Sequence, residues 1–136
     1  MKDILLYIWQ LPQNILGLLV VLITRAKYES GFSTLQEDGF YSTSEFGCFG
    51  ISLGNYIIFG GTPSKISIKH EKGHQKQSLY LGWLYLILIG IPSFFGNIWD
   101  RIAHKKWPLK DRIRWYYNQP WEKWADTLGG VERWIK

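Results

Sequence analysis

His70, Glu71 and His74 form an H-E-x-x-H pattern, and these residues are the most suited to chemistry in the chain. On an α-helix, residues four apart lie on one face, so both imidazoles can reach a single metal ion. Glu71 lies about 100° around the helix from His70, close enough to act on a water molecule at that metal. Zinc with two histidines, a third ligand and an open water position is a hydrolytic site. The alternative interpretation is two solvated histidines beside a surface glutamate.

A second acidic pattern, E-x-x-A-D, begins at Glu122 and ends at Asp126. Pro120 suits the first turn of a helix and Gly129 suits its C-terminal cap, so we expect a short helix over 120–128. Both carboxylates then share one helix face. One of them can complete a zinc site, and the other can accept a hydrogen bond from a ligand histidine and fix its tautomer. The alternative is a solvated acidic pair on an amphipathic helix.

Together, the two patterns resemble those of the gluzincin zinc peptidases, and in particular the branch that includes the CAAX prenyl proteases and the bacterial heat-shock membrane proteases. The resemblance covers residues 62–130 and is carried by the two motifs. It implies a small, mostly helical zincin-like domain with peptidase activity. It also implies a role for each motif residue: Zn²⁺ ligands at His70, His74 and Glu122, a general base at Glu71, and support of a ligand histidine by Asp126.

Length and composition indicate one domain, residues 1–136, of the α+β class. Aromatic residues make up 17% of the chain, and the eight tryptophans and eight tyrosines favour sites with one apolar and one wet end, such as membrane interfaces. The net charge of +5 suits anionic lipid or nucleic acid. Because the basic residues are scattered and no nucleic-acid-binding motif is present, we expect membrane lipid, and no nucleic acid, as a partner.

Cys48 is the single cysteine of the chain, so the sequence contains neither an internal disulfide nor a zinc site built from several thiolates. We expect it to be a small buried residue rather than a nucleophile.

Two apolar stretches, residues 4–24 and 79–99, have the length of a membrane span. The first contains Gln10, Gln13 and Asn14 near its middle, and it lacks the small-residue cleavage site of a signal peptide, so we expect an apolar membrane helix over 4–24. Both stretches are apolar nearly all round, and the remaining chain is too small to wrap two such helices. This favours membrane association over two core helices of a soluble protein.

The proposed zinc site constrains the second stretch, because two ligands precede it and the third follows it. A single crossing of the bilayer would separate these ligands. We therefore expect residues 79–103 to form an apolar helical hairpin that turns at 90–93, where Pro92 removes a helical hydrogen bond and Gly90 permits a turn. The hairpin would enter one leaflet or pack against residues 4–24, and a buried hairpin of a soluble fold is the alternative.

Residues 45–60 are predicted to be a β-hairpin region. The apolar segments 51–53 and 56–59 flank Gly54-Asn55, a suitable two-residue turn. In zincins that this chain resembles, a strand ahead of the active-site helix pairs with extended substrate, and such edge pairing is a general way to hold a peptide. A structural hairpin without a ligand is the alternative.

Three further features concern the predicted metal site. Thr62-Pro63 suits an N-cap followed by the first helical position, which predicts a metal-binding helix over 62–78. His104 is a rival third ligand, but its cationic neighbours favour a solvated helix face. Tyr116 and Tyr117 are both candidates to donate a hydrogen bond to an oxyanion, and the sequence does not choose between them.

The sequence therefore predicts a membrane-associated zinc peptidase that cleaves a peptide or protein substrate with an activated water molecule, Glu71 carrying the proton. The competing interpretation is a non-catalytic, zinc-stabilised membrane protein with an assembly, immunity or interaction role. Glu71 favours the enzyme, because a purely structural site has little reason to hold a carboxylate there. A single-pass anchor with a basic tail and no metal would require both motifs to be accidental.

Overall fold

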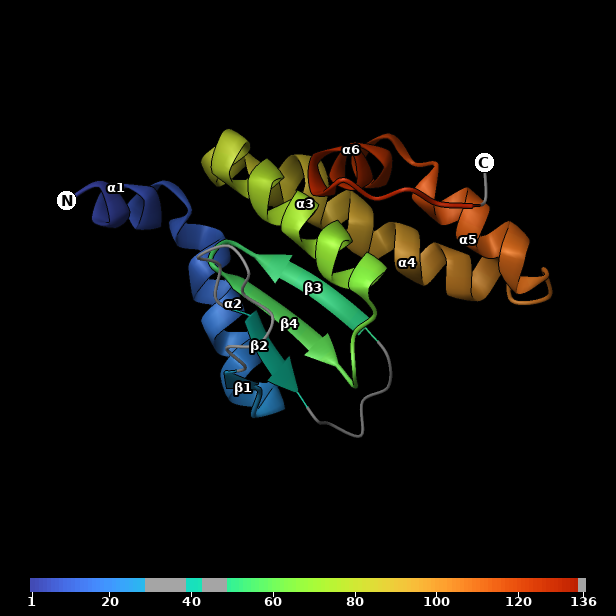
Figure 1. Ribbon diagram of the computed structural model, residues 1–136, viewed down its shortest axis with the longest axis horizontal. Coiled ribbons are helices and arrows are strands. Elements are labelled where there is room, and N and C mark those ends of the chain that lie inside the picture. The colour runs from blue at the N-terminus through green and yellow to red at the C-terminus, as the bar shows by residue number, and fades with distance from the viewer. Residues whose placement is uncertain (29–38, 43–48, 135–136) are drawn as a thin grey trace.

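The computed structural model describes residues 1–28, 39–42 and 49–134, and it confirms a mostly helical chain of the α+β class (Figure 1). The helices are α1 (Lys2–Trp9), α2 (Leu11–Thr24), α3 (Lys65–Leu81), the 3₁₀ turn η2 (Gly82–Leu84), the π-helical turn η3 (Leu86–Gly90), α4 (Ile91–Ala103), α5 (Leu109–Tyr117) and α6 (Pro120–Gly129). The strands are β1 (Lys27–Tyr28), β2 (Gly39–Ser42), β3 (Phe49–Leu53) and β4 (Tyr56–Gly60).

The four strands form one sheet in the order β1-β2-β4-β3, with β4 in its interior and β3 at one edge. β4 pairs parallel with β2 and antiparallel with β3. The β3–β4 hairpin turns at Gly54-Asn55, with Leu53 paired to Tyr56, and Gly54 has a φ of +61° that favours glycine. Ile58 and Phe59 of β4 are at most 2% exposed, and burying such side chains stabilises the fold by roughly 1.5–3 kcal/mol each.

The first part of the predicted hairpin region, residues 45–48, lies outside the described residues, and so does Cys48. The expectations for these residues stay predictions.

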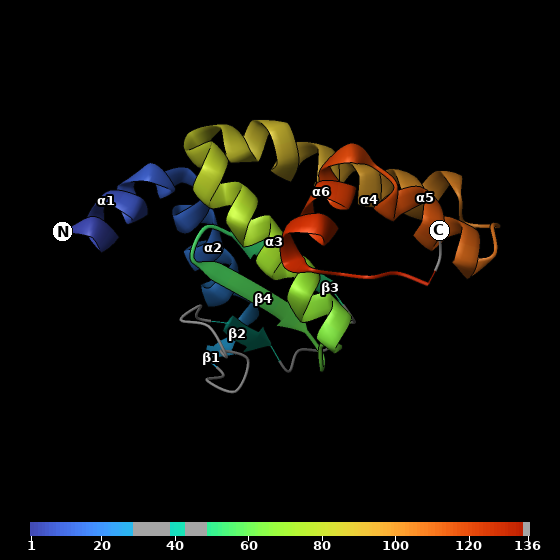
Figure 2. The same ribbon diagram turned by 45° about the horizontal axis from the view of Figure 1, so that its top comes forward.

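Helix α3 carries the H-E-x-x-H pattern and begins later than the sequence suggested. Its N-cap is Ser64, whose hydroxyl accepts a hydrogen bond from the Ser67 amide at 3.1 Å, so the predicted start at Thr62 is wrong. Helix α3 packs on the β3–β4 hairpin and on α6. In Figure 2 it lies between the sheet and α4.

The chain reverses direction after α3 at Gly82, and not at residues 90–93 as predicted. Gly82 has a φ of +53°, and an added Cβ would lie 2.2 Å from the Trp9 ring, so both the turn and the packing require glycine. Residues Leu86–Ala103 then form one continuous helical segment through Pro92. The π-helical turn η3 ends two residues before Pro92, near the point where the regular helical hydrogen-bond pattern must change. Figure 1 shows α4 running back past α3 and α6 towards α5, so the site motifs meet without a turn in the apolar helix.

The apolar segment 4–24 is also not one helix. It is divided at Gln10 into α1 and α2, and the two helices are bent by 82°. Gln10 and Gln13 are at most 1% exposed and both bond to the Ser78 hydroxyl, at 2.7 and 3.1 Å. Asn14 accepts a hydrogen bond from the Asn55 amide at 2.8 Å. These polar side chains fix the bend because buried amides must find partners.

Helices α3 and α6 approach each other closely at two glycines. A Cβ added to Gly73 would lie 1.8 Å from the Ala125 carbonyl oxygen, and one added to Gly129 would lie 2.0 Å from the Lys69 carbonyl oxygen. Both distances are far below van der Waals contact, and both neighbours are backbone atoms that cannot rotate away. The α3–α6 contact therefore depends on the absence of side chains at these positions.

Gly73→Ala is expected to separate α3 from α6 and to destabilise the protein by at least 1–3 kcal/mol, as overpacking does. The matched control is Gly96→Ala, because a Cβ there would meet its nearest atoms only at 3.9 and 4.0 Å. That variant should keep or raise stability, by up to about 1 kcal/mol, since alanine is the better helix former. Thermal unfolding of both variants checks this, and equal melting temperatures would contradict it.

Candidate metal centre

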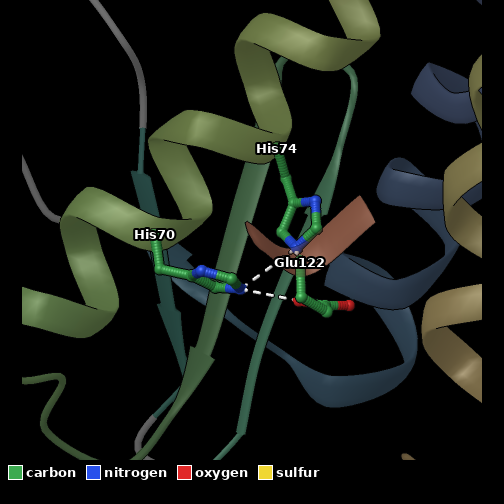
Figure 3. A group of neighbouring side chains, drawn as sticks. All are labelled: His70, His74 and Glu122. Atoms are coloured by element: carbon green, nitrogen blue, oxygen red, sulfur yellow. Dashed lines mark hydrogen bonds and ion pairs between the residues drawn. The ribbon is translucent and has the colours of Figure 1, made fainter. Parts of the chain in front are cut away.

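His70, His74 and Glu122 bring three potential metal-ligand atoms together (Figure 3). The two Nε2 atoms lie 3.1 Å apart, and Glu122 Oε2 lies 3.0 Å from that of His70 and 3.2 Å from that of His74. In a tetrahedral zinc site with bonds of roughly 2.0–2.1 Å, neighbouring ligand atoms lie roughly 3.3 Å apart. The distances therefore fit a small four-coordinate ion after a displacement of a few tenths of an ångström.

The second nitrogen of each imidazole has its own acceptor. His70 Nδ1 lies 2.7 Å from Asp126 Oδ1, and His74 Nδ1 lies 2.7 Å from Gln77 Oε1. The Gln77 amide is oriented in turn, since its Nε2 donates to the Trp121 carbonyl at 2.8 Å. Both Nδ1 atoms thus act as donors, which leaves both Nε2 lone pairs for a metal. This is the usual support for ligand histidines.

Glu122 is completely buried, and its second oxygen is held by the apolar helix. Ser93 Oγ donates to Glu122 Oε1 at 2.5 Å, and the Tyr116 hydroxyl lies 3.1 Å from the same Ser93 oxygen. Glu122 Oε2 is therefore the oxygen that faces the two imidazoles. The Tyr116 hydroxyl is already engaged with Ser93, so of the two neighbouring tyrosines it is the less suited to bind an oxyanion.

Asp126 contacts both His70 and the C-terminal segment. Arg133 donates to its two oxygens, at 2.5 Å from Nε and 2.9 Å from Nη2. The guanidinium also lies 3.4 Å from the centre of the Tyr117 ring, whose edge-to-face neighbour is His70. Arg133 and Tyr117 thus fix the carboxylate that orients His70.

Glu71 lies outside the ligand group but beside it, and it is only 6% exposed. A Cβ added to Gly50 of β3 would lie 2.6 Å from Glu71 Oε1, so the glycine makes room for the carboxylate. Burial raises the pKa of Glu71, although nearby His74 and His70 act in the opposite direction. A carboxyl group with a raised pKa is a better proton acceptor near neutral pH.

The metal-free centre holds a proton tightly. Burial by itself lowers the pKa of His70, but its contacts with Asp126 and Glu122 outweigh burial and raise that pKa to about 9. Burial by itself raises the pKa of Glu122, but hydrogen bonds from His70 and His74 hold it well below its ordinary value. The pKa of Asp126 is lowered in the same way, because hydrogen bonds from His70 and Arg133 outweigh burial.

His104 is not part of the centre, and the prediction of a solvated position is wrong. It is only 7% exposed, and its ring stacks on Trp107 with centroids 3.8 Å apart. Its Nδ1 lies 3.1 Å from Asp100 Oδ1, and Arg112 donates to the other oxygen of Asp100 at 2.7 Å. The aromatic ring and the two charged partners account for its burial.

The sequence patterns missed Gln77, Ser93 and Arg133. Gln77 follows His74 by three residues, so it lies on the same side of α3, and this spacing was a usable signal. Ser93 is a hydroxyl in an otherwise apolar stretch, which was a weaker signal. Arg133 follows Asp126 by seven residues beyond a helix end, and no spacing rule would have indicated it.

Purified protein is expected to carry about one zinc ion per chain, because three ligands converge on one point. His74→Ala should lose most of the metal, and Asp126→Asn should weaken binding roughly 10- to 100-fold. His104→Gln is the matched control, since it removes a buried histidine from outside the centre and should retain zinc. Metal analysis and competition with a chromophoric chelator measure this, and full retention of zinc by His74→Ala would contradict it.

Stability of the metal-free protein is expected to depend on pH through His70. The pKa of His70 rises from 6.5 to about 9 on folding. Its contribution to the free energy of unfolding is therefore complete below pH 6.5 and is lost as the pH passes about 9. The free energy of unfolding in EDTA should fall by roughly 3 kcal/mol across this range. Zinc replaces the same proton, so the free energy of unfolding of the zinc-loaded protein should fall much less over this pH range. Urea unfolding at several pH values tests this, and an equal fall in His70→Gln would exclude His70 as the cause.

Comparisons with known proteins identify no relative of this chain. No protein-family model matches it, and no curated protein or solved structure matches it. The chemistry of the centre is therefore inferred from its own residues and distances.

Proposed function

We propose that this chain is a zinc-dependent peptidase of the gluzincin type that acts at a membrane. The observation that carries the proposal is the convergence of His70, His74 and Glu122, with the Glu71 carboxylate beside them but outside the ligand group. A site that only stabilises a fold needs the ligands alone. A hydrolytic site needs the additional base.

The centre fits zinc through its donor set of two imidazole nitrogens and one carboxylate oxygen. His70, His74 and Glu122 would hold the ion. Bound there, zinc would supply Lewis acidity towards a peptide carbonyl and would lower the pKa of a water molecule. Gln77 and Asp126 keep the ligand imidazoles in the required tautomer, and Ser93 orients the Glu122 carboxylate.

Glu71 is the proposed general base. Within the described residues its carboxylate accepts no hydrogen bond, so its oxygens are available to a water molecule. It would accept the proton of the attacking water and return it to the nitrogen of the leaving amine as the peptide bond breaks. The raised pKa of Glu71 suits both transfers near neutral pH.

The edge strand β3 supplies a place for an extended peptide. In the β3–β4 register, Leu53, Ile51 and Phe49 bond to β4, so the backbone groups of Gly50 and Ser52 point away from it. The Ser52 carbonyl is occupied by the Tyr85 hydroxyl at 2.9 Å. Gly50 is exposed and lies against Glu71, so a peptide strand paired there would pass the proposed base.

A non-catalytic, zinc-stabilised membrane protein is the second candidate. The observation in its favour is that the ligands are at most 5% exposed and join α3, α6 and, through Ser93, α4. A metal at this position would hold three helices together. Both candidates require zinc, so metal content does not separate them.

Glu71→Gln separates the two candidates. It keeps size and polarity and leaves the three ligands in place, so the variant should fold and bind zinc as the wild type does. It should lose peptide cleavage by at least the 10²-fold typical of a missing general base. Unstructured peptides and membrane proteins serve as substrates. Glu132→Gln is the matched control, because it makes the same change at an exposed position and should keep activity.

Wild-type protein and Glu71→Gln that both bind zinc and behave alike in every cleavage assay would contradict catalysis. The structural zinc protein would then be the better account.

A further inference from the structure

The helical segment Leu86–Ala103 has one exposed apolar face, called here the apolar stripe. Its members are between 36% and 72% exposed: Ile87, Ile91, Phe94, Phe95, Ile98 and Ile102. At 100° per residue, the members from Ile91 onward fall within an arc of about 100°. The stripe is therefore continuous along the helix, and no described element covers it.

The opposite face of the same segment packs against the protein, where it buries Ile89 and carries the polar side chains of Ser93 and Asp100. Ser93 donates to Glu122, and Asp100 is buried between His104 and Arg112. Asn97 and Arg101 border the stripe and bond to each other at 2.8 Å. A helix that packs one face on its own protein and exposes an apolar stripe on the other can lie in the plane of a membrane interface with the stripe towards the acyl chains.

Crossing the bilayer would place charge in the hydrocarbon core. The segment Leu86–Ala103 is long and apolar enough to span, but Ser93 lies near its midpoint and touches Glu122. Lys123, the exposed neighbour of Glu122, would then lie near the bilayer centre. That centre is roughly 15 Å from either surface of the hydrocarbon core. A lysine at that depth is costly. An orientation in the membrane plane avoids this, because α6 packs on the face opposite the stripe.

The α4–α5 turn at the end of the stripe is basic and aromatic. Residues 100–114 contain six lysine or arginine residues and two aspartates, a net charge of +4 within a chain of +5. Lys105 and Lys106 are exposed, as are Trp107 at 46% and Leu109 at 69%. Basic residues near a membrane attract anionic lipid, and tryptophan favours the headgroup level.

The internal contacts of this turn fix its shape. His104 is held by Asp100 and stacks on one side of the Trp107 ring, while Arg112 ties Asp100 to α5. These contacts hold the turn in a fixed shape at the end of the helix that carries the stripe.

We propose that Leu86–Ala103 lies in the plane of an anionic phospholipid bilayer, with the apolar stripe in the outer acyl region and the α4–α5 turn among the headgroups. This deepens the membrane association proposed above, and it does not depend on metal binding or catalysis. Charge complementarity selects the lipid: the stripe is uncharged, and residues 100–114 at its end have a net charge of +4.

The orientation is tested by depth measurements on the full chain in vesicles that contain about 30% phosphatidylglycerol in phosphatidylcholine. Single cysteines at Ile87, Phe94 and Ile102, in a Cys48→Ser background, carry a spin label. Collision with oxygen and with a water-soluble nickel chelate reports depth. We expect all three labels at one depth, roughly 5–10 Å below the headgroups. A label at Lys69 on α3 should remain in water.

A spanning helix would give a different profile. Ile87 and Ile102 would be separated by roughly 22 Å along the bilayer normal, with Phe94 the deepest of the three. That result would overturn the proposal. Spin labels that are shielded from lipid, and whose spectra are broadened by labels on neighbouring copies of the chain, would also overturn it. The stripe would then be an interface between copies. Glu71→Gln should leave all depths unchanged, so loss of catalysis and loss of this orientation are distinguishable.

The lipid preference is tested separately. Lys105→Gln combined with Lys106→Gln should weaken partitioning to the anionic vesicles roughly 10- to 30-fold and change partitioning to pure phosphatidylcholine little. The matched control combines Lys65→Gln with Lys69→Gln, the same charge change on exposed positions of α3. An equal loss in both double variants, or none in either, would overturn the role of the turn.

Discussion

The close approach of α3 and α6 is the constraint on which the rest of the structure depends. Two backbone positions without side chains let the helices meet at a separation that ordinary residues forbid. Because Gly73 lies between the two histidines, the closest approach falls at the ligand group itself. Glu122 on α6 thereby reaches both imidazoles with one carboxylate oxygen. A wider spacing would leave Glu122 Oε2 buried without its two imidazole partners, and a buried charge without such compensation is costly.

The charges of the centre balance one another through a chain of partners. Arg133 neutralises Asp126, Asp126 binds His70, and Glu122 is compensated by the imidazoles and by the Ser93 hydroxyl. Every carboxylate of this network therefore has a hydrogen-bond donor before any metal is present. Such a network orients ligands in advance, so little reorganisation is needed on metal binding.

Local patterns predicted the parts of the site that depend on one helix at a time. The spacing of His70 and His74 and that of Glu122 and Asp126 follow from helical periodicity alone. Features that depend on distant partners were missed or misplaced. Gly82 forms the turn because the Trp9 ring packs against it, seventy-three residues away in sequence, whereas Pro92 gave a stronger local turn signal.

The same limit applies elsewhere in the fold. The bend at Gln10 depends on Ser78 of α3, and the parallel pairing of β2 with β4 joins segments that no local motif connects. The β3–β4 turn at Gly54-Asn55 was predictable because all of its determinants lie within a few residues.

Ser93 has a consequence for where the chemistry would take place. It joins Glu122 to the helix whose other face carries the apolar stripe, so the centre and the stripe are separated by a single helix, a layer about 10 Å thick. In the proposed orientation this helix sets the distance between the metal centre and the acyl chains. Peptide bonds would be reached only at a set height above the acyl chains, and segments emerging from the bilayer would be selected by their distance from it as well as by their sequence.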